Sequence, residues 1–346
     1  MMKLSRYRHI CLAGYLSILS CSFLLPMLAH ASTAPPITLV ATTPLPEIVG
    51  DFDHFAVDLK RNHLFISAEE HHSIELFDLK SGKHLKSIGG VQTPHTLAFV
   101  PEKDELFISD GGASACIVLS GDDFHETGRI PLAGGPDSAF YDADTKIFYV
   151  GNGGRGDKSP VSKITEISVT NHRVLGEIEI DGDNVESMAV DHAHSRLFVN
   201  IRDKKQVGVV DLTTKQTVSK WTAPEMNRNT TLAFDAASQR VFVAGRTPGK
   251  FFVFNAENGH VVSTTDCVNI ADGMVWDSAL RRIYVTGSQG VSIFHQRTKD
   301  EYEKLAELPT NGGKTSIYVP QLKQLYIVHP KTEIDNAALL VYQVNP

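Results

Sequence analysis

A unit of four short apolar runs repeats along most of this chain. In its first copy, residues 50–88, each run alternates apolar with polar residues and ends at Gly, Asn, Asp or Ser, which is typical of short, half-buried antiparallel strands. An apolar residue followed by an aromatic one in the second run recurs at a spacing of 41 to 50 residues. The seven pairs are Leu64-Phe65, Leu106-Phe107, Ile147-Phe148, Leu197-Phe198, Val241-Phe242, Ile283-Tyr284 and Leu325-Tyr326.

A period of this length, filled by four short strands, is the signature of β-propeller blades. The sequence therefore predicts an all-β, seven-bladed propeller of four-stranded antiparallel blades. The last unit stops after its third strand, whereas residues 37–46 precede the first full unit and match the register of a fourth strand. We expect this N-terminal strand to complete the last blade and close the ring, which removes exposed sheet edges.

Residues 1–31 have the three parts of a secretory signal peptide: basic residues, an apolar run and the ending Ala29-His30-Ala31. The alternative is a retained membrane anchor, but Ser17, Ser20 and Pro26 interrupt the apolar run. We expect cleavage, so that residues 32–346 form a single propeller domain in the periplasm or outside the cell, without a transmembrane anchor.

Charge and cysteine content exclude some partners and cofactors. The chain has 33 basic and 40 acidic residues and a net charge of −7; the signal contains three of the basic residues and no acidic one, so the remainder is more acidic. This disfavours nucleic acid, which requires a basic surface. Cys116 and Cys267 fall in distant units, so we expect no disulfide, and no Cys-x-x-Cys motif is present.

Two strings, Tyr149-Val150-Gly151-Asn152 and Tyr284-Val285-Thr286-Gly287, each precede a third strand of alternating apolar residues. In these strings the chain resembles the bacterial YVTN-repeat propellers, which are similar to WD40 repeats and include YncE-like periplasmic proteins. The resemblance covers essentially the whole predicted domain. It implies the fold more than the function, because such propellers include binding proteins as well as relatives with lactonase or lyase activity.

In a propeller of this type, two sets of loops converge on one mouth of the central channel. One set joins the outer strand of a blade to the inner strand of the next, and the other joins the second and third strands. The ligand-binding candidates that we expect at this mouth are Asp53, His54, His95, Asp137, Glu186, Asn229, Arg246 and Asp272.

The carboxylates among these candidates could hold a divalent cation such as Ca²⁺, which takes six to eight oxygen ligands. Asp137, Glu186 and Asp272 are the predicted metal ligands. In the alternative interpretation the rim residues bond to backbone and water, and arginines neutralise the carboxylates instead of a metal: Arg155, Arg202, Arg228 and Arg246.

Two functions of different class remain open. The first is an exported, monomeric binding protein that recognises a small molecule, a glycan or a protein at the channel mouth. The second is a metal-assisted lactonase, ester hydrolase or lyase at the same mouth, where a divalent ion polarises a carbonyl and a nearby His or Asp acts as base. The sequence contains no motif that requires catalysis, which favours binding.

Overall fold

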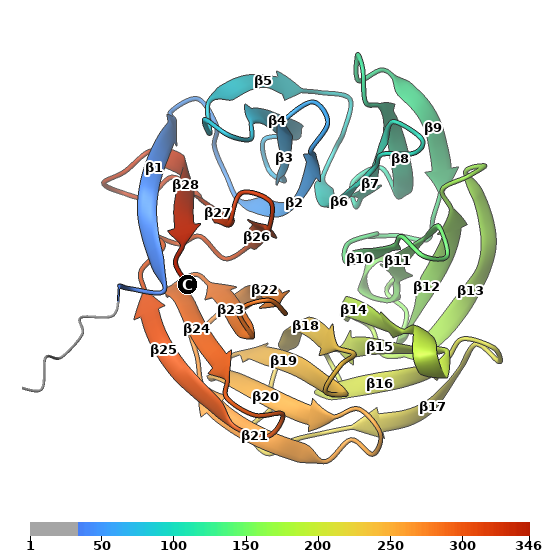
Figure 1. Cartoon of the computed structure of the whole chain (residues 1–346). Helices are drawn as coiled ribbons and strands as arrows, with labels where there is room; N and C mark the ends of the chain where they lie inside the picture. Colours follow the sequence, from blue (N-terminus) through green and yellow to red (C-terminus); the bar gives the residue numbers. More distant parts are fainter. Residues whose placement is uncertain (1–33) are drawn as a thin grey trace, which may run out of the picture. The chain divides into compact units, whose positions relative to one another are not determined.

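Seven four-stranded antiparallel sheets follow one another around a ring in Pro35–Pro346 (Figure 1). The computed structural model describes residues 34–346, and the predicted signal peptide lies outside these residues. The inner strands of neighbouring sheets contact each other all the way round, from β2 to β6 and finally from β26 back to β2. The predicted seven-bladed propeller is confirmed. Within the described part of the chain, no helix has the length and hydropathy that a membrane span requires.

We number the blades along the chain, and each contains four strands from the hub outwards. Blades 1 and 2 contain β2 (Phe52–Asp58), β3 (His63–Ala68), β4 (Ser73–Asp78), β5 (His84–Ile88), β6 (Pro94–Val100), β7 (Glu105–Asp110), β8 (Ala115–Ser120) and β9 (Glu126–Pro131). Blades 3 and 4 contain β10 (Ala139–Asp142), β11 (Ile147–Gly153), β12 (Val161–Ser168), β13 (Arg173–Asp181), β14 (Val185–Asp191), β15 (Arg196–Ile201), β16 (Gln206–Asp211) and β17 (Gln216–Trp221).

The remaining blades complete the ring. Blades 5 and 6 contain β18 (Asn229–Asp235), β19 (Arg240–Arg246), β20 (Gly249–Asn255), β21 (Val261–Asp266), β22 (Ala271–Asp277), β23 (Arg282–Gly287), β24 (Gly290–Gln296) and β25 (Tyr302–Leu308). Blade 7 contains β26 (Ser316–Val319), β27 (Gln324–His329), β28 (Ala337–Val344) and β1 (Ile37–Leu45). Two short 3₁₀ helices, Gly154–Asp157 and His192–His194, are the only helical segments among residues 34–346.

The N-terminal strand closes the ring as predicted. β1 pairs antiparallel with β28, so that Ile37 lies opposite Val344 and Leu45 opposite Ala337. The sheet order β1-β28-β27-β26 makes β1 the outer strand of blade 7. The last blade is therefore built from both ends of the domain, and Figure 1 shows β1 beside β28.

The hydrophobic core is divided into seven clusters, each formed by two neighbouring blades. Phe65 of blade 1 packs with Leu97 and Leu106 of blade 2, and Tyr326 of blade 7 packs with Phe52 of blade 1. All the recurring second-strand aromatics are buried. Because each blade covers its faces only against its neighbours, closure of the ring completes the core.

Blade 3 differs by one residue from the predicted register. Ile147 pairs with Asp142, as His63 pairs with Asp58 in blade 1. The residue equivalent to Phe65 is therefore Tyr149, and the sequence alignment on Phe148 is one residue early. Because Phe148 and Tyr149 are adjacent aromatic residues, either one can be aligned with Phe65 in the sequence. Successive side chains in a strand, however, point to opposite faces. Accordingly Tyr149 packs towards blade 4 and Phe148 towards blade 2.

The two cysteines of the described chain, Cys116 and Cys267, are buried free thiols in different blades. Burial raises the pKa of each thiol to about 12. A thiol of this kind is a poor nucleophile, because the thiolate is the reactive form. Both cysteines therefore act as small apolar residues.

Candidate binding site at the hub

One repeat position supplies most of the charged side chains at the hub. It lies five residues before the residue that ends each inner strand. From blade 1 to blade 7, its occupants are Asp53, His95, Asp137, Glu186, Thr230, Asp272 and Lys314. All except Thr230 line one cavity of about 180 Å³, which we call the hub cavity. The ring thus gathers residues that are far apart in the sequence.

A second repeat position adds to the same cavity. It lies four residues after the buried aromatic of the second strand, and its members Glu69, Arg202 and Arg246 line the hub cavity. His54 and Ser138, each next to a first-position residue, complete the lining. Every lining residue is polar or charged, and both predicted sets of loops contribute.

Strand irregularities explain why first-position side chains reach the hub. The pairing of β2 with β3 shifts register between Phe52 and Phe55, on either side of Asp53. The β14–β15 pairing shifts likewise between Val185 and Met188, on either side of Glu186. A β-bulge bends the strand and redirects the side chain of the extra residue.

Hydroxyl groups of one blade hold the backbone of site residues in the next. Ser67 Oγ donates a hydrogen bond to the carbonyl oxygen of His95 at 2.7 Å, and Ser109 Oγ donates to that of Asp137 at 2.6 Å. Both serines end the same string, Phe-Ile-Ser, in the second strand. The sequence analysis missed these serines, although the repeated string was a usable signal.

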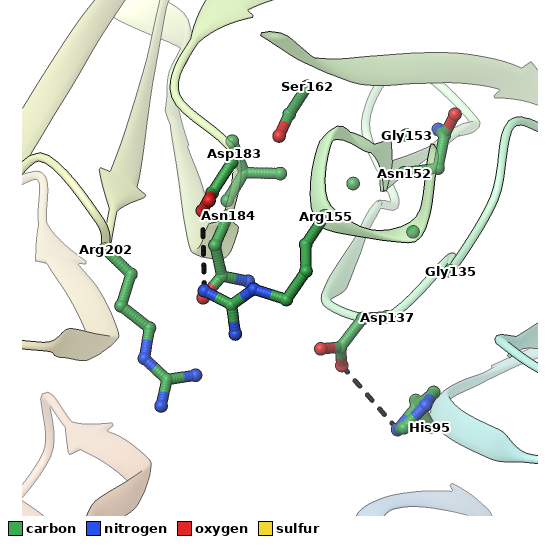
Figure 2. A pocket seen from close by; sticks show the side chains of 13 residues that line it. His95, Gly135, Asp137, Asn152, Gly153, Arg155, Ser162, Asp183, Asn184 and Arg202 are labelled. Carbon is green, nitrogen blue, oxygen red and sulfur yellow. Dashed lines mark hydrogen bonds and ion pairs between the residues drawn. The ribbon is translucent and has the colours of Figure 1, made fainter. Parts of the chain in front are cut away.

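Ion pairs connect the first three blades across the hub. His95 Nδ1 lies 2.9 Å from Asp53 Oδ2 and 3.7 Å from Asp137 Oδ1, the latter shown in Figure 2. Burial disfavours the protonated ring, but the hydrogen bond to Asp53 and the charge of Asp137 raise the pKa of His95 to about 10. Burial also opposes ionisation of Asp53, yet His54, His95 and Lys314 hold its pKa well below its ordinary value. This part of the hub places the His95 ring between two carboxylates, which favour its protonated form.

The opposite part of the hub contains guanidinium–carboxylate pairs. Arg202 Nη1 donates to Glu186 Oε1 at 2.6 Å, and Ser138 Oγ donates to Glu186 Oε2 at 3.1 Å. Arg246 forms an ion pair with Asp272. Burial raises the pKa of Glu186 to about 7, even though Arg202 opposes the shift. Glu186 can therefore exchange a proton near neutral pH.

Lys314 forms ion pairs with carboxylates of the two neighbouring blades. Its ammonium forms an ion pair with Asp51, and Nζ lies 3.6 Å from Asp272 Oδ2. Asp51 precedes β2 and Lys314 precedes β26, so this contact exists only because blade 7 meets blade 1. Ring closure thus contributes to the site as well as to the core.

A second cavity of about 270 Å³ opens beside the hub cavity and shares His95, Asp137 and Arg202 with it. We call it the side cavity. Figure 2 shows Arg155 and Arg202 on either side of the loop that contains Asp183 and Asn184. The backbone N–H of Arg155 donates to the Asp183 carbonyl at 2.7 Å, and that of Arg202 donates to the Asn184 carbonyl at 2.9 Å. One loop therefore fixes both arginines.

Seven of the eight predicted binding residues line the hub cavity: Asp53, His54, His95, Asp137, Glu186, Arg246 and Asp272. Asn229 does not, because Thr230 occupies the repeat position in blade 5. The Asn229 side chain is fully buried, and Nδ2 donates to Asn200 Oδ1 at 2.7 Å. The central lining also includes Glu69, Arg202 and Lys314, which the predicted set omitted.

The three predicted metal ligands all line the hub cavity, but each has a cationic neighbour. The closest cationic groups to Asp137, Glu186 and Asp272 belong to His95, Arg202 and Arg246, respectively. A different group, Asp53, Glu69 and His95, offers possible ligand atoms within 4.8 Å of one another.

Two solved structures share this fold. One is a chain of a structure titled "Crystal Structure of Mitotic Checkpoint Complex", with 14% identity and a TM-score of 0.72, covering 93% of this chain and 99% of that chain. The other is a chain of Kuenenia stuttgartiensis hydrazine synthase, with 15% identity and a TM-score of 0.69, covering 86% and 98%. No family model matches the sequence, and no curated protein matches it. At such low identities, the two structures support the propeller fold and nothing finer.

Proposed function

We propose that this chain is an exported propeller of the YVTN-like type that binds a small polar molecule at its hub. The observation that carries the proposal is the convergence of charged side chains from all seven blades on one cavity, through two repeat positions. Cavities of about 180 and 270 Å³ lie at or below the lower end of the range for ligand pockets. Their size favours a small molecule over a glycan chain or a protein segment.

The electrostatics of the hub support a binding role. Burial raises the pKa values of Glu69, Asp137 and Glu186, which line the hub cavity together with Asp53. Crowded carboxylates destabilise a fold, and shifted pKa values cluster at functional sites. A ligand that donates hydrogen bonds to these carboxylates would relieve their mutual repulsion.

Binding can be tested by calorimetric titration of the purified protein with a library of small polar metabolites. For a ligand so identified, we expect Asp137→Asn and Glu186→Gln to weaken binding about tenfold or more, because a hydrogen bond to a charged group contributes about 1.5–3 kcal/mol. Asp123→Asn, at an exposed turn away from the hub, is the matched control. A ligand that binds with unchanged affinity to both the Asp137→Asn and the Glu186→Gln variants would contradict the proposal.

The alternative function is a metal-assisted hydrolase or lyase, and one observation favours it: the proximity of Asp53, Glu69 and His95. A divalent ion held there would polarise a lactone or ester carbonyl. The ion pair of His95 with Asp53 opposes this, because it favours the protonated ring and a ligating imidazole must be neutral. Elemental analysis, with lactone and ester turnover measured before and after chelation, separates the two functions. One divalent ion per chain, with activity that is lost on chelation and in Glu69→Gln, would favour the enzyme.

Export depends on residues 1–31 acting as a cleaved signal. We expect the protein recovered from a periplasmic or secreted fraction to begin after Ala31. N-terminal sequencing of that fraction tests this, and a full-length chain retained in the membrane fraction would favour the anchor interpretation.

A further inference from the structure

We propose that the hub cavity binds the ammonium group of a small primary amine, held by the carboxylates of Glu69 and Asp137, and that the hydrocarbon chain of this amine enters the next part of the central channel. This inference rests on the proposed binding function and specifies the charge and the chemical class of the ligand.

Two of the five carboxylates that line the hub cavity lack a close partner. The other three are paired with basic side chains: Asp53 with His95, Glu186 with Arg202 and Asp272 with Arg246. Glu69 and Asp137 lie beside His95, Glu69 within 4.8 Å and Asp137 at 3.7 Å from a ring nitrogen (Figure 2). Among residues 34–346, no group donates a hydrogen bond to either side chain, and Glu69 has no basic side chain at ion-pair distance. Acceptors in a cavity require donors, so these two carboxylates mark where a ligand should donate.

The lining also has more carboxylates than cations. Five carboxylates face three permanently charged cations, Arg202, Arg246 and Lys314. Lys314 in addition pairs with Asp51, which lies outside the cavity. Carboxylates therefore remain in excess whichever protonation states the two histidines of the lining adopt. An ammonium ion supplies one positive charge and three N–H donors, whereas an anionic ligand would add to the excess.

The hub cavity continues into a second cavity of about 200 Å³, which we call the channel cavity. The two cavities share His54 and Ser138. The other residues of the channel cavity follow the first repeat position by one or two residues along the inner strands: Phe55, Thr96, Ala139, Ser187, Met188 and Leu232. The channel cavity is therefore the part of the central channel that comes after the charged hub. Together the two cavities approach the size range of ligand pockets, about 300–1,000 Å³.

Apolar side chains supply much of the wall of the channel cavity. Four of them come from blades 1, 3, 4 and 5: Phe55, Ala139, Met188 and Leu232. Two hydroxyl groups of the wall are already bonded. Thr96 Oγ1 accepts a hydrogen bond from the backbone N–H of Ala139 at 3.2 Å, and Ser138 Oγ donates to Glu186. A hydrocarbon chain placed there leaves apolar surface out of water and deprives neither hydroxyl of its partner.

The test is calorimetric titration of the purified protein, freed of metal ions by chelation, with n-alkylamines from ethylamine to hexylamine and with alcohols of the same chain length. We expect each amine to bind at least about tenfold more tightly than its alcohol, because hydrogen bonds between charged groups are stronger than those of a neutral donor. Each added CH₂ should tighten amine binding about two- to fourfold until the chain fills the channel cavity.

Substitutions assign these effects to the two cavities. Glu69→Gln and Asp137→Asn should each weaken the binding of every amine about tenfold. Glu126→Gln, on the exposed outer strand of blade 2, should change nothing. Ala139→Leu should fill the channel cavity, so that hexylamine binds this variant no more tightly than ethylamine does, and ethylamine binding shows that the variant is folded. Leu232→Ala should enlarge the cavity, so that the gain continues to longer chains.

Equal affinities for an amine and its alcohol, or normal amine binding to Glu69→Gln, would overturn the inference. Amine affinities that do not change with chain length would overturn the assignment of the hydrocarbon chain to the channel cavity. Failure of the amines, together with a ligand of another class that depends on Asp137 or Glu186, would leave the proposed function intact and refute this inference alone. If neither the amines nor the metabolite library yields a ligand, both fail.

Discussion

Leu45 and Leu39 lie in the same strand and provide a direct test of ring closure. Leu45 ends β1, is 2% exposed and packs with Phe52 and Phe77 of blade 1. Leu39, near the start of β1, is 48% exposed. We compare Leu45→Ala with Leu39→Ala, because the two substitutions remove the same atoms from one strand and differ mainly in burial.

The expected magnitudes follow from this burial. A leucine truncated to alanine in a core costs about 2–5 kcal/mol, and more when the cavity cannot collapse. The cavity at Leu45 would have walls from two sheets, whose strands fix their positions, so we expect the upper half of that range. Half-exposed Leu39 should cost less than about 1 kcal/mol. With an unfolding entropy of about 2.1 cal/mol/K per residue, Leu45→Ala should lower the melting temperature by about 5 to 8 °C.

Calorimetry and urea unfolding measured on both variants and the parent protein test this prediction. Tryptophan fluorescence can follow unfolding, because Trp221 and Trp276 lie in blades 4 and 6. Equal effects of the two substitutions, or no effect of Leu45→Ala, would mean that β1 does not close blade 7 against blade 1.

Two further predictions concern the hub. The pKa of His95 is raised from 6.5 to about 10, so its protonated form stabilises the fold most below pH 6.5, and this contribution is lost as the pH rises towards 10. The melting temperatures of the parent protein and His95→Asn should therefore converge over that range, and a difference that does not change with pH would refute the ion pairing of His95. An alanine Cβ at Gly111 would lie 2.9 Å from His95 Nε2 and 3.3 Å from the Pro136 carbonyl oxygen, so Gly111→Ala should lower the free energy of unfolding in urea by about 1–3 kcal/mol. The control Gly89→Ala, whose added Cβ meets no atom within 4 Å, should change it little. Equal losses of stability in the two variants would refute the close packing of His95.

The fold could be predicted because the spacing of the recurring aromatic residues equals the length of one blade, and the blade is repeated along the chain. Each copy of the apolar pattern repeats the same four strands, so a misread residue in one copy does not change the number of copies. Phe148 illustrates this: the alignment was one residue early in blade 3, and the prediction of seven blades still held. Strand β1 could be predicted because the last unit lacked a fourth strand.

The site was less accessible to sequence reasoning, because it depends on single-residue register and on contacts between blades. Asn229 and Thr230 are adjacent polar residues, and only the strand pairing decides that Thr230 holds the repeat position. Arg202 follows β15 and Arg246 ends β19, and charged residues are common next to hairpin turns. Their pairing with Glu186 and Asp272 depends on how neighbouring blades meet, which no local pattern encodes.

The symmetry of the ring explains why cationic residues occupy some of the repeat positions at the hub. Equivalent positions lie around one axis, so seven carboxylates at the first repeat position would repel one another. The chain avoids this with His95 and Lys314 at that position and with arginines from the second position in blades 4 and 5. These charges largely balance within the hub. Blade 3 adds a longer connection, 154–160, whose 3₁₀ helix contains Arg155 and borders the side cavity. Arg155 has no counterpart at the equivalent position of the other blades and pairs with Asp183 of the following loop, so blade 3 departs from the symmetry of the ring beside the hub.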